Sequence, residues 1–160
     1  MKIVSTSAKG NFNLIVQNNT ITELKYNNWF SENATATLHS HTITLKPKNI
    51  WTSRINIFKN EEAIGDITFN LKGYIIIKLT NNEGEINYIL KNNSLWKLKF
   101  EVFNASNELQ FSLKSENKWT KLNYDYEIEE INFDQQTNFE ELALYCGYAA
   151  NLYLAIISAV

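Results

Sequence analysis

Short apolar runs separated by polar turns recur along the first three quarters of the chain, roughly every 8–12 residues, a spacing typical of short strands joined by turns. In the clearest run, 96–102, apolar side chains alternate with charged ones. Successive side chains of a strand point to opposite faces, so this alternation predicts a sheet with one apolar and one polar face. Asparagine pairs such as Asn18-Asn19 and Asn92-Asn93 are typical of turns between strands. The pattern predicts about twelve antiparallel strands, mostly in sequential hairpins, over residues 1–126.

The last stretch, 138–160, follows a different pattern that indicates a helix. Asn138 is a suitable N-cap, and Glu141 stands three residues later, as in a capping box. From Leu142 onward only Asn151 and Ser158 are clearly polar, so the apolar residues do not keep to one face. A helix that is apolar all round must be enclosed on every side or lie in a bilayer.

A closed antiparallel barrel, lined by the apolar faces of its strands, encloses such a helix most simply. We therefore predict a mainly β protein in which about twelve strands form a closed barrel around a hydrophobic C-terminal helix. The expected organisation is one domain, 1–160, with barrel strands over 1–126. An acidic connector over 127–137 then leads to the central helix over 138–160.

Composition restricts the function more than the fold. Hydrophobic residues make up 44% of the 160 residues, as in an ordinary globular domain. The net charge of −2 and a single arginine, Arg54, argue against nucleic-acid binding, because arginine is preferred for bidentate phosphate contacts. Cys146 is the only cysteine, and residues 1–10 lack the apolar stretch of a signal peptide. We therefore expect a cytoplasmic protein that, at most, binds a membrane surface peripherally.

The order of the predicted elements resembles a known superfamily. After about twelve short strands, residues 127–160 join an acidic stretch to a terminal apolar helix, EIEEINFDQQTNFEELALYCGYAANLYLAIISAV. In this order and length the chain resembles the superfamily of tubby C-terminal domains, phospholipid scramblases and plant LURP-one-related proteins. The resemblance implies a twelve-stranded barrel threaded by a hydrophobic C-terminal helix, and it implies anionic-lipid binding as in the tubby group. It carries no site residue over to this chain.

His39 and His41, the only histidines of the sequence, are a candidate metal site. Two residues apart on a strand, they could face one metal ion as in cupins, but Leu45 and Lys46 stand where cupins have a glutamate. We predict instead a hairpin turn with two solvated histidines, and we expect neither a metal nor a cofactor.

Other side chains that could carry chemistry have simpler explanations. Cys146 lies within the apolar helix, where a small apolar filler is a better interpretation than a nucleophile. The acidic residues of 127–134 lack the spacing of an EF-hand loop, which predicts a solvated connector. The sequence has no glycine-rich phosphate loop, CxxC pair or nucleophile elbow, so we predict that the protein is not an enzyme.

Lys46, Lys48, Trp51 and Arg54 form a basic and aromatic cluster around Pro47. Such a cluster suits anionic lipid headgroups, although an ordinary solvated hairpin end has the same composition. The leading hypothesis is a non-enzymatic binding or scaffolding module, whose partner is an anionic membrane surface or another protein. Two alternatives stay open: a cupin-like metal-dependent enzyme that uses His39 and His41, and a barrel that carries a lipid in its lumen beside the helix.

Overall fold

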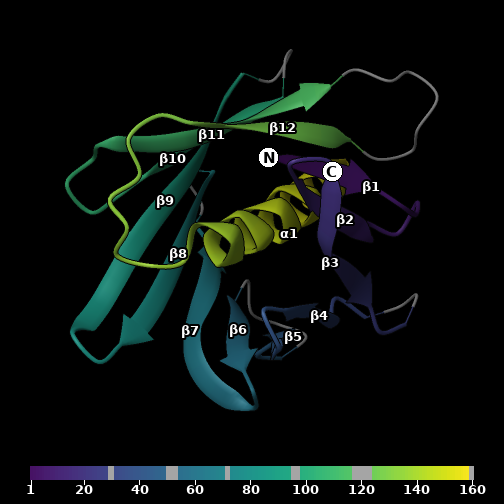
Figure 1. The fold of residues 1–160 in the computed structure, drawn as a ribbon, viewed down its shortest axis with the longest axis horizontal. Coiled ribbons are helices and arrows are strands. Elements are labelled where there is room, and N and C mark those ends of the chain that lie inside the picture. The colour runs from purple at the N-terminus through teal and green to yellow at the C-terminus, as the bar shows by residue number, and fades with distance from the viewer. Residues whose placement is uncertain (29–30, 50–53, 71–72, 95–97, 117–123, 159–160) are drawn as a thin grey trace.

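The computed structural model describes residues 1–160 except 29–30, 50–53, 71–72, 95–97, 117–123 and 159–160. The described part contains twelve strands and one helix (Figure 1): β1 (Lys2–Ser5), β2 (Phe12–Val16), β3 (Asn19–Tyr26), β4 (Ala34–Leu38), β5 (His41–Pro47), β6 (Arg54–Lys59), β7 (Glu62–Phe69), β8 (Tyr74–Asn81), β9 (Gly84–Ser94), β10 (Lys99–Phe103), β11 (Leu109–Glu116), β12 (Asp125–Glu130) and α1 (Phe139–Ser158). The predicted fold class, a closed antiparallel barrel with a C-terminal helix, is confirmed.

The strands form an antiparallel meander in which each strand pairs with its neighbours in sequence. The first and last strands close the ring through the pairs Lys2↔Glu127 and Ile3↔Tyr126. The backbone N–H of Ile128 extends this closure by donating to the carbonyl oxygen of Met1 at 2.9 Å. Helix α1 runs through the ring of strands (Figure 1).

Strand β10 illustrates how the alternating pattern builds the core. Phe100 and Val102 are fully buried, whereas Lys99 and Glu101 face outward and form an ion pair at 2.5 Å. The beginning of the predicted alternation, 96–97, lies outside the described residues. Leu98 has a φ of 41° in a turn, so the strand begins one residue later.

The helix begins as predicted. The side-chain oxygen of Asn138 accepts a hydrogen bond of 2.9 Å from the backbone N–H of Glu141, which satisfies one of the free donors of the first turn. Every residue from Leu142 to Ala150 is buried. The helix therefore occupies the lumen of the barrel, where it meets the apolar side chains of the strands.

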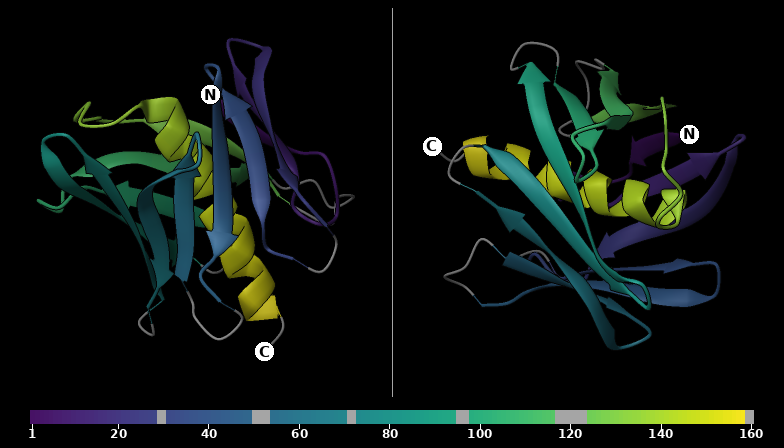
Figure 2. Two further views of the ribbon diagram at one scale, coloured as in Figure 1. Left: turned by 90° about the horizontal axis from the view of Figure 1, so that it is seen from below. Right: turned by 90° about the vertical axis from the view of Figure 1, so that its left-hand side faces the viewer.

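The predicted burial on every side is wrong for the last turn of the helix. Among the residues whose burial the structure describes, Leu152 is the last buried one, and Ala155, Ile156 and Ile157 are exposed. A helix of 20 residues is about 30 Å long at 1.5 Å per residue, and its last turn passes beyond the ring of strands (Figure 2).

Two predicted boundaries also need correction. Glu127 to Glu130, assigned to the acidic connector over 127–137, belong to β12, where they pair with β11. The Asn92-Asn93 pair lies within β9 instead of in a turn, with Asn92 opposite Phe100. In both places pairing with a neighbouring strand prevails over the local preference of the residues for a turn or a connector.

Candidate functional site

The connections of the meander alternate between the two ends of the barrel, and two hydrogen bonds show which end the helix leaves by. The side-chain amide of Asn151 donates to the carbonyl oxygen of Gly10, in the β1–β2 connection, at 3.2 Å. The hydroxyl of Tyr148 donates to the carbonyl oxygen of Glu32, in the β3–β4 connection, at 2.7 Å. The connections after odd-numbered strands thus surround the last turns of α1. We call this end the exit end, and the end where the helix begins the entry end.

Most of the large exposed hydrophobic side chains of the described part lie at the exit end. Tyr74 begins β8, Tyr124 directly precedes β12, and Ile156 and Ile157 lie on the emerging helix. The fifth such residue of the described part, Ile131, follows β12 at the entry end; all five are between 38% and 49% exposed. Exposed apolar side chains at one end of a globular protein are candidates for an interaction site, so this end is the candidate binding surface.

Three of the four residues of the predicted basic cluster lie together at the same end. Lys46, Lys48 and Arg54 are exposed where β5 leads into β6. The backbone N–H of Lys48 donates to the carbonyl oxygen of Arg54 at 2.9 Å, which holds the two residues side by side. Trp51 lies outside the described residues.

Arg54 has a partner that the sequence did not indicate. Its Nη2 lies 2.6 Å from Oδ2 of Asp66, on the adjacent strand β7, and Asp66 is only 7% exposed. A nearly buried carboxylate needs such a counter-charge, so Arg54 stabilises the barrel wall. The charge that this connection offers to a ligand therefore comes from Lys46 and Lys48.

Lys91 adds a positive charge beside one of the exposed aromatic rings. Its ammonium nitrogen lies 5.5 Å from the ring centroid of Tyr74 and 4.3 Å from that of Phe103. Tyr74 and Lys91 are register partners on β8 and β9. The exit end thus combines aromatic, aliphatic and basic side chains.

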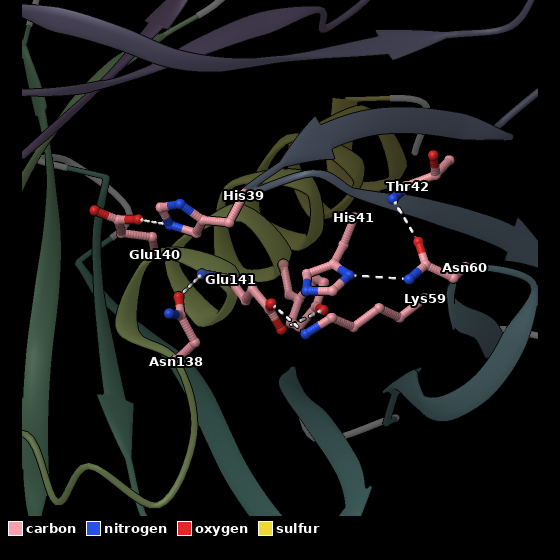
Figure 3. Close-up of polar contacts among 9 residues, drawn as sticks. His39, His41, Thr42, Lys59, Asn60, Asn138, Glu140 and Glu141 are labelled. Atoms are coloured by element: carbon pink, nitrogen blue, oxygen red, sulfur yellow. Dashed lines mark hydrogen bonds and ion pairs between the residues drawn. The ribbon is translucent and has the colours of Figure 1, made fainter.

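The entry end contains the two histidines (Figure 3). His39 lies in the β4–β5 turn with a φ of 48°, and its Nε2 contacts the carboxylate of Glu140 at the start of α1. His41 instead accepts a hydrogen bond at Nδ1 from the side-chain amide of Asn60, at 2.9 Å. The two imidazoles thus contact different partners, and the described residues include no group of three or more His, Cys, Asp or Glu placed to hold a metal ion.

A partly buried ion pair joins the helix start to the barrel wall. Nζ of Lys59 lies 2.6 Å from Oε1 of Glu141, and the hydroxyl of Tyr145 lies 3.5 Å from the other carboxylate oxygen (Figure 3 labels the ion pair). An open cavity of about 270 Å³ adjoins the pair, and Ile64 and Leu79 contribute to its apolar wall. Because Lys59 and Glu141 carry opposite charges, the pair contributes no net charge to this cavity.

The remaining candidates for chemistry occupy structural positions. Burial raises the pKa of the Cys146 thiol well above its ordinary range, and the side chain is fully buried. Asp134 accepts a hydrogen bond of 2.9 Å from the hydroxyl of Tyr88. Glu129 contacts Lys114 on the outer face of the barrel. The buried thiol of Cys146, with its raised pKa, lacks the thiolate character of a nucleophile.

No family model, curated protein or solved structure matches this chain. The resemblance to the tubby, scramblase and LURP-one-related superfamily therefore stays a prediction. In the part of the chain that the structure describes, no helix combines the length and hydropathy of a membrane span.

Sequence reasoning found the lysines of the exit end but missed its hydrophobic residues. The signal was available in the meander, which places every connection after an odd-numbered strand at the same end. Tyr74 and Tyr124 both stand at the end of such a connection. Predicting the exposure of Ile156 and Ile157 requires the height of the barrel, which the sequence pattern does not give.

Proposed function

We propose that the protein is a non-enzymatic binding module that docks its exit end on an anionic membrane surface. The observation that carries this proposal is that four exposed hydrophobic side chains lie at the same barrel end as exposed Lys46 and Lys48. Tyrosine rings and aliphatic side chains suit the boundary between lipid headgroups and acyl chains. Lysines beside them suit the negative charge of that surface.

The expected affinity is weak and reversible. Each lysine near an anionic surface contributes about 1 kcal/mol, and full burial of an isoleucine contributes roughly 1.5–3 kcal/mol. Ile156 and Ile157 are already partly covered, so each gains only a fraction of that amount. Salt should weaken the binding, because counter-ions screen the lysines.

Cosedimentation with phosphatidylserine-containing vesicles and with neutral phosphatidylcholine vesicles, at low and moderate salt, tests the proposal. The Ile156→Ser/Ile157→Ser and Lys46→Ala/Lys48→Ala variants should each lose most of the binding. Ile131→Ser, which removes an equally exposed isoleucine at the entry end, should bind like the wild type. Arg54 stays unchanged in every variant, because its loss would leave Asp66 without a counter-charge.

Binding that both exit-end variants retain, or that neutral vesicles reproduce at every salt concentration, contradicts the proposal and favours a protein partner for the same surface. The metal-dependent enzyme and the lipid-carrying barrel stay alternatives of a different kind. Metal analysis of the purified protein tests the first, and organic extraction followed by mass spectrometry tests the second.

A further inference from the structure

The barrel wall is incompletely paired between β3 and β4. Only two register pairs join these strands, Lys25↔Thr35 and Tyr26↔Ala34, whereas the β2–β3 and β4–β5 ladders have five pairs each. Beyond the two pairs, the β2–β3 and β4–β5 hairpins diverge toward their turns (right-hand view of Figure 2). We call this incompletely paired region the β3–β4 seam.

An open groove of about 630 Å³ lies along the seam. Its lining includes Glu23 and Thr37, which face outward, and also Thr22 and Ala36, which are buried and face the lumen. Because side chains of a strand alternate between the two faces, a groove lined from both faces cuts into the wall. The groove therefore reaches the backbone edges of the two strands.

Backbone groups of both strands face this groove. The N–H of Asn27 donates to the carbonyl oxygen of Asn33 at 2.9 Å, so the backbone groups of these two residues point toward the neighbouring strand. Hydrogen-bonding positions alternate along an antiparallel strand, so the backbones of Glu23 and Thr37 point across it as well. Neither residue has a register pair in this ladder. Unpaired strand edges of this kind are a template for a further strand.

Thr22, one of the residues that line the groove, carries a buried hydroxyl. Thr22 is 6% exposed, and its Oγ1 has no hydrogen-bond partner among the described residues. Buried polar side chains are hydrogen-bonded in the large majority of cases, and an exception needs an explanation. A ligand that lies in the groove and donates to or accepts from Thr22 supplies one.

We propose that the β3–β4 seam binds an extended peptide segment of a partner protein, which adds backbone hydrogen bonds to the free edge of β3 and one hydrogen bond to Thr22. Strand addition to an exposed edge is a recurrent mode of peptide recognition. This site runs along the barrel wall, its lining includes none of the residues on which membrane docking rests, and it does not depend on that docking.

The chemistry of the peptide follows from β4 itself. Where β4 pairs with β3, it presents Ala34 to the lumen and Thr35 to the outer face, so a small inward and a β-branched outward side chain fit beside β3. Glu23 and Lys25 on the outer face form an ion pair at 3.0 Å, so they offer no net charge to a ligand. The fitting partner is an uncharged segment that alternates small residues with threonine, serine or valine.

A synthetic peptide with the sequence of residues 33–39, capped at both ends, is the probe, and two-dimensional amide NMR of the full chain is the measurement. At millimolar peptide, the shifts should change along β3 and β4 around the groove, and the amides of Glu23 and Thr37 should become protected from hydrogen exchange. The same peptide with alternate backbone nitrogens methylated should not bind, because it cannot donate to a strand edge.

The Thr22→Val variant should bind the peptide about fivefold more weakly, the effect of losing one hydrogen bond. Ser112→Ala is the matched control, because the buried hydroxyl of Ser112 likewise has no hydrogen-bond partner among the described residues, but Ser112 does not line the groove. Both variants remove an unpaired hydroxyl and should keep the fold. No shift change at the groove, equal binding of the methylated peptide, or equal affinity of Thr22→Val and wild type overturns the proposal.

Discussion

The side-chain amide of Asn151 donates a hydrogen bond of 3.2 Å to the carbonyl oxygen of Gly10, and so joins the helix to the β1–β2 connection. Asn151 is half-buried, and it is the only clearly polar residue between Leu142 and Ile157. The bond therefore gives a physical reason for an asparagine within an otherwise apolar helix. It also marks the level at which α1 leaves the full enclosure of the barrel.

Replacing Asn151 by leucine should lower the free energy of unfolding by about 0.5–1.5 kcal/mol, because the Gly10 carbonyl loses its donor. Urea denaturation measures this change. The exposed position Ala155 provides the control, since Ala155→Ser should stay within about 0.5 kcal/mol of wild type. A more stable Asn151→Leu variant would show that water replaces the side-chain amide at no cost.

Gly147 lies where the helix backbone packs closely against side chains of the barrel wall. A Cβ added there would lie 2.6 Å from Cδ1 of Ile3 and 3.0 Å from Cζ of Phe12, and both of these side chains are fully buried. Gly147→Leu should therefore cost roughly 1–3 kcal/mol by overpacking, even though leucine favours a helix by nearly 1 kcal/mol over glycine.

A double-mutant cycle identifies the cause of that cost. Ile3→Val removes the Cδ1 atom that an added Cβ would meet, so Gly147→Ala should be less destabilising in the Ile3→Val background than in wild type. Chemical denaturation of the four proteins gives the coupling energy. Simple additivity of the two substitutions would place the strain elsewhere.

The sequence predicts those parts of the fold that local patterns determine. The alternation that includes Phe100 and Val102 requires only a period of two, and the cap at Asn138 requires only its own first turn. The end of β9 beyond Asn92 and the assignment of Glu127 to a strand depend on pairing with β10, β11 and β1. Register between neighbouring strands is therefore the information that the local pattern lacks.

In the candidate site, too, the sequence predicts what depends on neighbours along the chain and misses what depends on strand register. Lys46 and Lys48 could be named from the sequence because they are neighbours along the chain. The pairing of Arg54 with Asp66 could not, because the two residues meet only through the register of β6 and β7. Likewise, Thr22 becomes a candidate ligand-binding residue only once the short β3–β4 ladder is known.

The buried tyrosines predict how stability depends on alkaline pH. Burial raises the pKa of four fully buried hydroxyls above the ordinary value near 10, and these belong to Tyr88, Tyr126, Tyr145 and Tyr148. In the unfolded chain these groups ionise near pH 10, whereas in the folded barrel they keep their protons. Above about pH 10 the native state therefore binds more protons than the unfolded state, and the free energy of unfolding falls as pH rises.

Each of these tyrosines should contribute a slope of about 1.4 kcal/mol per pH unit above its unfolded pKa, measured by urea denaturation between neutral and alkaline pH. Tyr126→Phe isolates one contribution, because the Tyr126 hydroxyl has no hydrogen-bond partner among the described residues. This variant should match or exceed wild-type stability at neutral pH, and its stability should fall less steeply above pH 10. Tyr148→Phe should show the same reduced slope but lower stability at neutral pH, because it loses the 2.7 Å hydrogen bond to Glu32. If Tyr126→Phe keeps the full wild-type slope, the Tyr126 hydroxyl ionises within the folded barrel, and the dry lumen that this prediction assumes is wrong.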